Sequence, residues 1–173
     1  DLNFSQQHSV QVLDNGNLLF FDNHRYLSPE LSRCVEVAYD ESDYSTEIVW
    51  EHVLPENLFS GSRGECDRLE NGNTLIATGN GHSVLEVTPE KEIAWQIHQN
   101  DLPGITLAWV TTLEVLPNGN YVVGNCHAGP DNPLVIELNP KKKKVVWTLD
   151  RFETFGNSVP NSQLLDIPGR VRR

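Results

Sequence analysis

The chain has 173 residues, with 24 acidic and 13 basic side chains and a formal net charge of −11. We expect no nucleic-acid partner, because phosphate contacts need clustered cations. Hydrophobic residues make up 38% of the chain, which is enough for the core of one domain. No apolar run approaches the roughly 20 residues that span a bilayer, so we expect no membrane span.

The tripeptide Asn-Gly-Asn occurs three times, at residues 15–17, 71–73 and 118–120. Each copy separates two strand-like runs, such as residues 10–14 and 18–21 around the first copy. Asn-Gly between two such runs is typical of a β-hairpin. We expect both residues to adopt the positive φ of a type I′ turn.

Two further strand-like runs follow each hairpin. The first has an acid at its centre and the second carries a tryptophan, in the order Glu36, Trp50, Glu86, Trp95, Glu137 and Trp147. Four short antiparallel strands in about 40 to 50 residues have the size of a β-propeller blade. The sequence therefore predicts an all-β chain: a β-propeller built of four-stranded antiparallel blades, with about three blades present. We expect the recurring tryptophans to pack between blades.

The predicted blades form a single partial propeller over 1–173. They cover about residues 8–56, 60–104 and 108–158, and residues 159–173 resemble the start of a further blade. Propellers close with about four to eight blades, and an open arc leaves its edges exposed. Either the chain is a piece of a longer protein, or a second chain closes the ring. Two such chains would make six blades.

The three cysteines, Cys34, Cys66 and Cys126, do not follow a zinc-ligand spacing. They can form one disulfide and leave one free thiol, or all three can be buried as small apolar side chains. We favour the second interpretation. We expect no metal and no cofactor. The Gly79-Asn80-Gly81 run lacks the Lys-Ser/Thr pair and the helix of a phosphate loop.

The residue that begins the first strand of a blade faces the central channel of a propeller. Aligned on Asn-Gly-Asn, the positions that begin the units are His8, Gly64, Thr111 and Pro160. Only His8 is chemically versatile, since an imidazole can act as a nucleophile, a base or a hydrogen-bond donor. The alternative is a histidine that bonds a loop backbone.

Residues 4–60 contain an ordered set of motifs. They are Gln7-His8-Ser9-Val10, Asn17-Leu18-Leu19-Phe20-Phe21-Asp22-Asn23, Leu31-Ser32-Arg33, Val35-Glu36-Val37, Ile48-Val49-Trp50-Glu51 and Phe59-Ser60. In this order they resemble the bacterial arylsulfotransferase family, and the rest of the chain to about residue 165 matches it mainly as a generic blade repeat.

The resemblance implies a six-bladed propeller that is usually secreted or periplasmic. Members move a sulfuryl group from a phenolic sulfate ester to a phenol, without a nucleotide sulfate donor. On this match His8 is the histidine that becomes transiently sulfated. The family's pocket also uses histidines and an arginine from earlier blades, which other blades would have to supply here.

Other residues are candidates for binding the substrate. Arg63 is a candidate sulfate ligand, because a guanidinium fork matches a tetrahedral oxyanion, but it is equally a candidate solvated loop charge. Ser62 and Thr111 are candidate donors to the same anion, although a threonine at a strand start is more often structural. Trp109 stands outside the tryptophan series and is a candidate wall for an aromatic ring.

Two more histidines and a lysine run are assigned to loops and turns. We expect His82 and His127 to lie in surface loops beyond the second strands of their blades. Residues Lys141–Lys144 are expected to form a solvated turn that discourages edge pairing, with an anionic partner as the alternative.

Two function classes follow. The first is an arylsulfotransferase-like enzyme with His8 as covalent nucleophile, an aryl sulfate and a phenol as substrates, and a pocket completed by other blades. The second is a non-catalytic propeller that serves as a scaffold or binding subunit of a larger assembly. Converging His and Arg side chains favour the enzyme, whereas a plugged apolar channel favours the scaffold.

Overall fold

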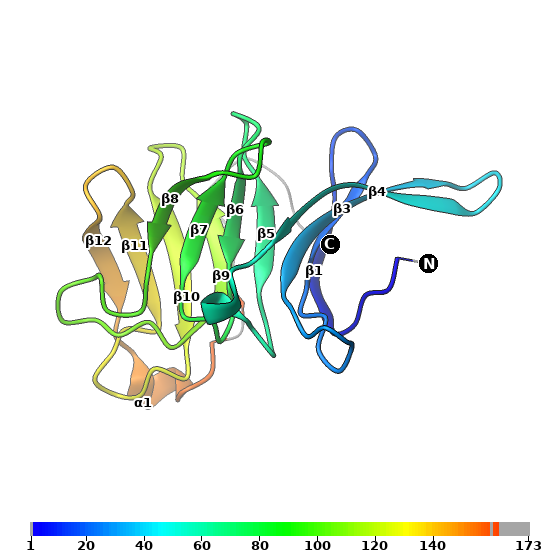
Figure 1. The fold of residues 1–173 in the computed structure, drawn as a ribbon. Coiled ribbons are helices and arrows are strands. Elements are labelled where there is room, and N and C mark those ends of the chain that lie inside the picture. Colours follow the sequence, from blue (N-terminus) through cyan, green and yellow to red (C-terminus); the bar gives the residue numbers. More distant parts are fainter. Residues whose placement is uncertain (1, 160, 163–173) are drawn as a thin grey trace.

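The computed structural model describes residues 2–159, 161 and 162, which form three four-stranded antiparallel sheets in chain order (Figure 1). Blade 1 contains β1 (Gln7–Val12), β2 (Leu18–Asp22), β3 (Arg33–Asp40) and β4 (Ser45–Val53). Blade 2 contains β5 (Glu65–Arg68), β6 (Thr74–Ala77), β7 (Val84–Val87) and β8 (Ile93–Ile97). Blade 3 contains β9 (Trp109–Val115), β10 (Tyr121–Cys126), β11 (Val135–Asn139) and β12 (Lys144–Leu149). The predicted all-β chain with about three propeller blades is confirmed.

Two short helical segments lie outside the sheets. The 3-10 turn η1 (Glu56–Leu58) belongs to the linker after blade 1, and α1 (Phe152–Phe155) follows blade 3. Of the expected start of a further blade at 159–173, only residues 159, 161 and 162 are among those that the structure describes.

The Asn-Gly-Asn hairpins occur at the predicted places, but their turn type differs from the prediction. In the first one, the Gly16 amide donates to the Leu13 carbonyl at 2.9 Å and the Leu13 amide donates to the Asn17 carbonyl at 2.8 Å. Gly16 has φ +87°, whereas Asn15 keeps a negative φ and accepts the Asn17 amide at its side-chain oxygen. This is a type I turn closed by a left-handed glycine, so only the glycine needs positive φ.

Blades 1 and 2 each bury one face of their sheet against the next blade. The core between blades 1 and 2 holds Leu19, Phe21, Ile76, Leu85 and Val87. The core between blades 2 and 3 holds Leu75, Val84, Leu113, Val123 and Ile136. Each such side chain stabilises the stack by about 1.5 to 3 kcal/mol. The alternation of apolar residues along the strands therefore fixes how the blades stack.

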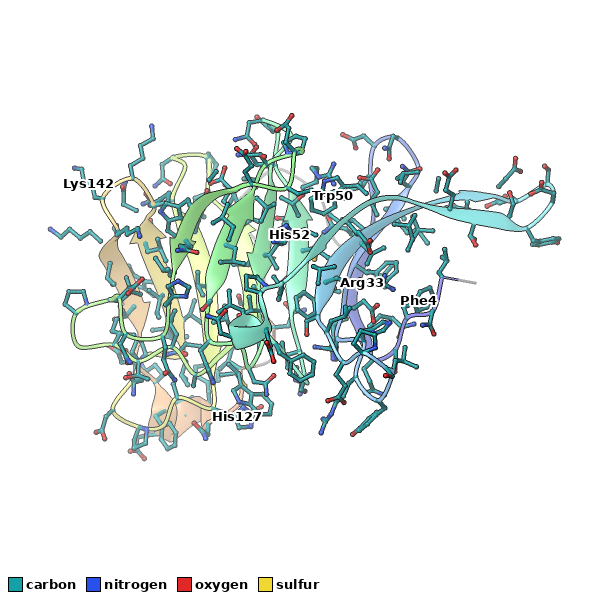
Figure 2. The ribbon with its side chains drawn as sticks, viewed as in Figure 1. Phe4, Arg33, Trp50, His52, His127 and Lys142 are labelled. Carbon is teal, nitrogen blue, oxygen red and sulfur yellow. A yellow bond between two sulfur atoms is a disulfide. The ribbon has the colours of Figure 1, made fainter. Side chains whose placement is uncertain are left out.

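The tryptophans of blades 1 and 2 pack between blades, as expected. Trp50 lies between blade 1 and blade 2 (Figure 2) and its indole N–H donates to the Pro89 carbonyl of blade 2 at 3.0 Å. Trp95 donates to the Pro140 carbonyl of blade 3 at 2.9 Å. Neither indole forms a ligand cage.

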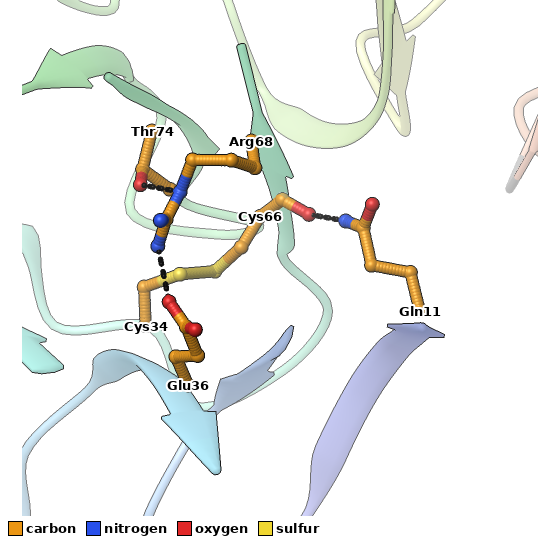
Figure 3. The surroundings of a disulfide bond; sticks show 6 residues. All are labelled: Gln11, Cys34, Glu36, Cys66, Arg68 and Thr74. Atoms are coloured by element: carbon orange, nitrogen blue, oxygen red, sulfur yellow. Dashed lines mark hydrogen bonds and ion pairs between the residues drawn. A yellow bond between two sulfur atoms is a disulfide. The ribbon is translucent and has the colours of Figure 1, made fainter. Parts of the chain in front are cut away.

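A disulfide between Cys34 and Cys66 also links blades 1 and 2, with Cα atoms 6.1 Å apart (Figure 3). The favoured interpretation of three buried thiols is therefore wrong for this pair, and Cys126 is the free, buried cysteine. Cys34 lies on the third strand of blade 1 and Cys66 on the first strand of blade 2. These positions oppose each other only when the blades stack, so spacing along the chain could not indicate the pairing.

The outer face of blade 1 is partly covered by the segment that precedes β1. The rings of Phe4 and Phe20 meet edge to face, with centroids 5.3 Å apart. Arg33 donates to the carbonyls of Leu2 and Asn3 at 3.1 Å each, and forms ion pairs with Asp22 and Glu51. The segment before β1 is thus held against its own blade.

Candidate functional site

The candidate residues gather at one end of the blades, which we call the strand-start face. Here β1, β5 and β9 begin, and the face is completed by linkers 54–64 and 98–108 and by the loops after β2, β6 and β10. It is the lower end of the molecule in Figure 1, where η1 and α1 lie. The opposite end carries the turns, including the exposed Lys141–Lys144 run, and Figure 2 shows Lys142 there, far from His127.

His8 lies near the beginning of β1, opposite Phe21 of β2. Directly opposed residues of an antiparallel pair share a face of the sheet. Phe21 packs into the core between blades 1 and 2, so the half-buried His8 is also turned toward blade 2. Within the described part of the chain, neither ring nitrogen of His8 has a hydrogen-bond partner. The tautomer of His8 is therefore not fixed by a hydrogen bond to any of these residues.

Arg63 is placed by a tight approach of the linker to blade 1. The next residue, Gly64, has φ +126°, and a Cβ built on it would lie 2.4 Å from the Phe21 ring. Only glycine permits this approach. The Asn23 side-chain amide also donates to the Arg63 carbonyl at 2.8 Å and to the Ser60 carbonyl at 2.6 Å. These contacts bring Arg63 beside the strands that hold His8.

The electrostatics of His8 reflect this placement. Burial lowers the pKa of the imidazole below its usual value, and the positive charge of Arg63 lowers it further. The neutral ring, which is the nucleophilic form, is therefore favoured at neutral pH. Among the residues that the structure describes, the Arg63 guanidinium forms no hydrogen bond or ion pair, so its donors are available to an anion.

Ser62 belongs to a network that fixes the linker onto blade 2. The Asn80 side-chain oxygen accepts the Ser60 hydroxyl at 3.0 Å and the Ser62 amide at 3.1 Å. The Ser62 carbonyl oxygen lies 2.9 Å from the same Ser60 hydroxyl, so the two oxygens share its single hydrogen. Asn23 and Asn80 were not identified from the sequence, although each comes shortly after the second strand of its blade, where a polar side chain can reach the linker.

Gly79 joins the linker to blade 3. Its backbone exchanges two hydrogen bonds with Val110, at 3.0 and 2.9 Å, and a Cβ built on it would lie 2.3 Å from the Ser62 carbonyl oxygen. Val110 lies between Trp109 and Thr111 at the beginning of β9. Gly79 thus connects the His8 and Arg63 side of the strand-start face with the Trp109 and Thr111 side.

Thr111 is buried, and its hydroxyl donates to the Val159 carbonyl at 3.2 Å. A hydroxyl has a single hydrogen to donate. In this arrangement Thr111 has the structural role that is more usual for a threonine at a strand start, and it would have to exchange this bond to contact an anion.

Trp109 is half-buried and stacks on the exposed ring of His127, with centroids 4.4 Å apart and 29° between the planes. One face of the indole is thereby covered. The Sγ of Cys126 lies 2.9 Å from Nδ1 of His127. His82, in the loop after β6, is bonded through Nδ1 to the Ala108 carbonyl. The loops that hold His82 and His127 follow the second strands, as expected.

The described residues contain neither a metal-binding cluster nor a membrane-spanning helix. No group of three His, Cys, Asp or Glu side chains within residues 2–159, 161 and 162 is arranged to hold a metal ion. No helix in this part of the chain combines the length and the apolar character needed to cross a membrane.

Comparison with known proteins gives a family and a fold. The family model described as Arylsulfotransferase (ASST) matches residues 2–151. No curated protein matches the chain. Among solved structures, the chain is similar to a protein of unknown function from Bacteroides caccae, with a TM-score of 0.51 and 18% identity over 91% of this chain and 71% of that one. At this identity the structural likeness supports the fold alone.

Proposed function

The chain belongs to the arylsulfotransferase family, and from this premise we propose that it transfers a sulfuryl group from a phenolic sulfate ester to a phenol, with His8 as the nucleophile. The observation that carries the proposal is the neighbourhood of His8. Burial and the charge of Arg63 lower the pKa of its imidazole, which favours the neutral ring, and the Arg63 guanidinium forms no hydrogen bond or ion pair with any described residue.

In the first half of the reaction, a neutral ring nitrogen of His8 attacks the sulfur of the aryl sulfate. A nitrogen–sulfur bond forms, the ester sulfur–oxygen bond breaks, and its electron pair leaves with the phenolate. In the second half, the oxygen of the acceptor phenol attacks the same sulfur, and its proton passes to solvent water. The nitrogen–sulfur electron pair then returns to His8, and the ring is regenerated.

The sulfuryl oxygens need cationic or hydroxyl donors throughout this sequence. We assign Arg63 to this role, because its fork can bind two of the oxygens and its donors have no described partner. Ser62 and Thr111 are the candidate hydroxyl donors, Thr111 after release of the Val159 carbonyl. The indole face of Trp109 that His127 leaves uncovered is the candidate surface for the phenolic ring.

The pocket proposed here is completed by further propeller blades or by a second chain that closes the ring. We also propose a periplasmic or secreted location. The Cys34–Cys66 disulfide supports it, since disulfides persist in oxidising compartments.

The test is a transfer assay with 4-nitrophenyl sulfate as donor and phenol as acceptor, with release of 4-nitrophenolate as the readout. Acceptor-dependent release that is lost in His8→Ala supports the proposal. His98→Ala, which removes another half-buried histidine of the strand-start face, is the matched control and should keep the activity. The assay uses the assembled protein with its ring closed, and release by this assembly that does not exceed that of the same assembly carrying His8→Ala would leave the scaffold as the function.

A further inference from the structure

The blades are joined by a contact that occurs twice among the residues that the structure describes. In both cases a tryptophan on the fourth strand of one blade donates its indole N–H to a proline carbonyl of the next blade. The pairs are Trp50 with Pro89, at 3.0 Å, and Trp95 with Pro140, at 2.9 Å. Pro89 and Pro140 both lie in the short turn between the third and fourth strands of their blades. We call the contact region between two neighbouring blades a joint. Because the same contact recurs, the geometry of the joint is a property of the repeat.

An acid on the third strand makes the second contact of each joint. Glu36 accepts the Arg68 guanidinium of blade 2 at 2.8 Å, and Glu86 accepts the Tyr121 hydroxyl of blade 3 at 3.0 Å. An asparagine of the Asn-Gly-Asn turn holds the other oxygen of each acid, with Asn17 at 2.7 Å and Asn73 at 2.6 Å as donors. Each acid is thus oriented by its own blade to receive a donor from the next blade.

Burial raises the pKa of Glu36, but the hydrogen bonds from Asn17 and Asn15 and the charge of Arg68 outweigh that effect and lower it overall. The carboxylate is therefore ionised in the joint. A charged acceptor bonded to a guanidinium or a phenol forms a strong contact between blades.

Blade 3 also carries the acid and the tryptophan that blades 1 and 2 present to the next blade. Asn120 donates to Glu137 at 2.6 Å, and Glu137 pairs with Trp147 across β11 and β12, as Glu36 pairs with Trp50. Trp147 is nevertheless 51% exposed, and neither its indole N–H nor the second oxygen of Glu137 has a partner in the described part of the chain. The apolar residues around them on this face are Val122, Leu134, Val135 and Leu149.

We propose that this face of blade 3, centred on Glu137 and Trp147, seats a further four-stranded blade of the same repeat. That blade presents a carbonyl of its third turn to Trp147 and an arginine or tyrosine to Glu137. The proposal rests on the ring closure described under the proposed function and names the chemistry of the blade that follows blade 3. The joints between blades 1 and 2 and between blades 2 and 3 show the contacts that we expect at this face.

Blade 1 of a second copy does not carry the donor side chain and the turn carbonyl that blades 2 and 3 present to the preceding blade. The donors Arg68 and Tyr121 come from the cross-strand pair next to the Asn-Gly-Asn turn, and in blade 1 this pair is Val12 with Leu18. The third and fourth strands of blade 1 are also eight and nine residues long, against four and five in blade 2. Their hairpin projects away from the sheet (Figure 1), so its turn does not lie where Pro89 and Pro140 lie.

The experiment supplies a matching blade within the full chain. A variant in which residues 111–159 occur twice in succession places a second Tyr121 and a second Pro140 after the first blade 3. With Trp147→Phe in the second copy and 5-fluorotryptophan labelling, ¹⁹F NMR reports the first Trp147 by its solvent isotope shift. We expect this resonance to respond to solvent in the unmodified chain and to become protected, as Trp95 is, in the duplicated chain. The melting temperature should rise as well.

The control is the same duplication with Tyr121→Asp in the second copy, which sets a carboxylate against Glu137. Its Trp147 resonance should stay solvent-responsive. A Trp147 that remains exposed in the folded duplicated chain would overturn the proposal, and so would a duplicated chain that fails to fold, because a matching blade must add a stabilising interface. A dimer of the unmodified chain that Trp147→Lys converts to a monomer would assign the face to a second copy instead. None of these readouts depends on sulfuryl transfer, so this proposal and the proposed function fail separately.

Discussion

Arg63 lies close enough to His8 for its charge to lower the pKa of the imidazole, although His8 begins blade 1 and Arg63 lies just before blade 2. The linker reaches blade 1 because Gly64 leaves room for the Phe21 ring. A cation beside a half-buried imidazole favours the neutral, nucleophilic ring. In the proposed reaction the same cation holds the sulfate, and the ring attacks its sulfur.

Arg63→Gln should raise the pKa of His8 toward its ordinary value, because the substitution removes the positive charge and leaves only the effect of burial. The measurement is the titration of the imidazole C–H resonance, assigned by its loss in His8→Gln. Arg25→Gln is the matched control, since Arg25 also contacts the linker, at the Gly61 carbonyl, but does not influence His8. An unchanged His8 titration in Arg63→Gln would show that the two residues do not interact.

The stability of the fold should decrease as the pH falls below about 6.5, partly because of His52. Burial lowers the pKa of His52 in the folded chain, and the charge of Lys91 lowers it further. The unfolded chain therefore binds a proton at a pH where folded His52 does not. This contribution to stability is complete above the unfolded pKa and is lost as the pH falls through the folded pKa.

His52→Gln should reduce the loss of unfolding free energy between pH 7 and pH 5, as measured by urea unfolding. Equal losses in wild type and His52→Gln would contradict the linkage to His52. His8 acts in the same direction, because its pKa is lowered too.

Removing the Cys34–Cys66 disulfide by double substitution to serine should lower the free energy of unfolding. The bridge closes a loop of 32 residues, and the chain-entropy estimate for such a loop is about 3 to 4 kcal/mol. Urea unfolding of the oxidised chain and of the double variant measures the difference. Thiol titration of the denatured, unreduced chain should find a single free thiol, from Cys126. Three free thiols would contradict the disulfide.

Gly79→Ala should weaken the contact between the two sides of the strand-start face and so destabilise the fold. Both Gly79 and Gly104 have positive φ, at +56° and +73°, so alanine is strained at either position, by about 1 kcal/mol. Only at Gly79 does the new Cβ also meet a backbone oxygen, that of Ser62, whereas nothing lies within 4 Å at Gly104. We expect Gly79→Ala to unfold at lower urea concentration than Gly104→Ala. Equal stability would show that Gly79 does not limit the approach of the linker to β9.

The repeat could be predicted from the sequence because its signals are local. Asn-Gly-Asn turns, the acid of the third strand and the tryptophan of the fourth all lie within one blade, and each appears in the structure where the pattern placed it. The prediction of the turn type was wrong, because Asn-Gly is favoured both in a type I′ turn and in a type I turn that ends in a left-handed glycine.

Contacts between blades were harder to predict. The Cys34–Cys66 pair, the Asn80 contacts to Ser60 and Ser62, and the approach of Arg63 to His8 all depend on how blades stack and where linkers cross. No periodicity of the sequence encodes those distances. The motif around His8 could be found because it is contiguous, whereas the residues that surround it come from other blades.

Covalent labelling of His8 tests the central claim most directly. The assembled protein with its ring closed is incubated with 4-nitrophenyl sulfate without acceptor, quenched in alkali, and digested with trypsin, and the His8 peptide that ends at Arg25 is sequenced by mass spectrometry. The claim predicts a sulfuryl adduct on His8 that disappears when phenol is added and does not form in His8→Ala. A chain that releases 4-nitrophenolate but carries its adduct elsewhere, or that carries no adduct at all, would contradict it.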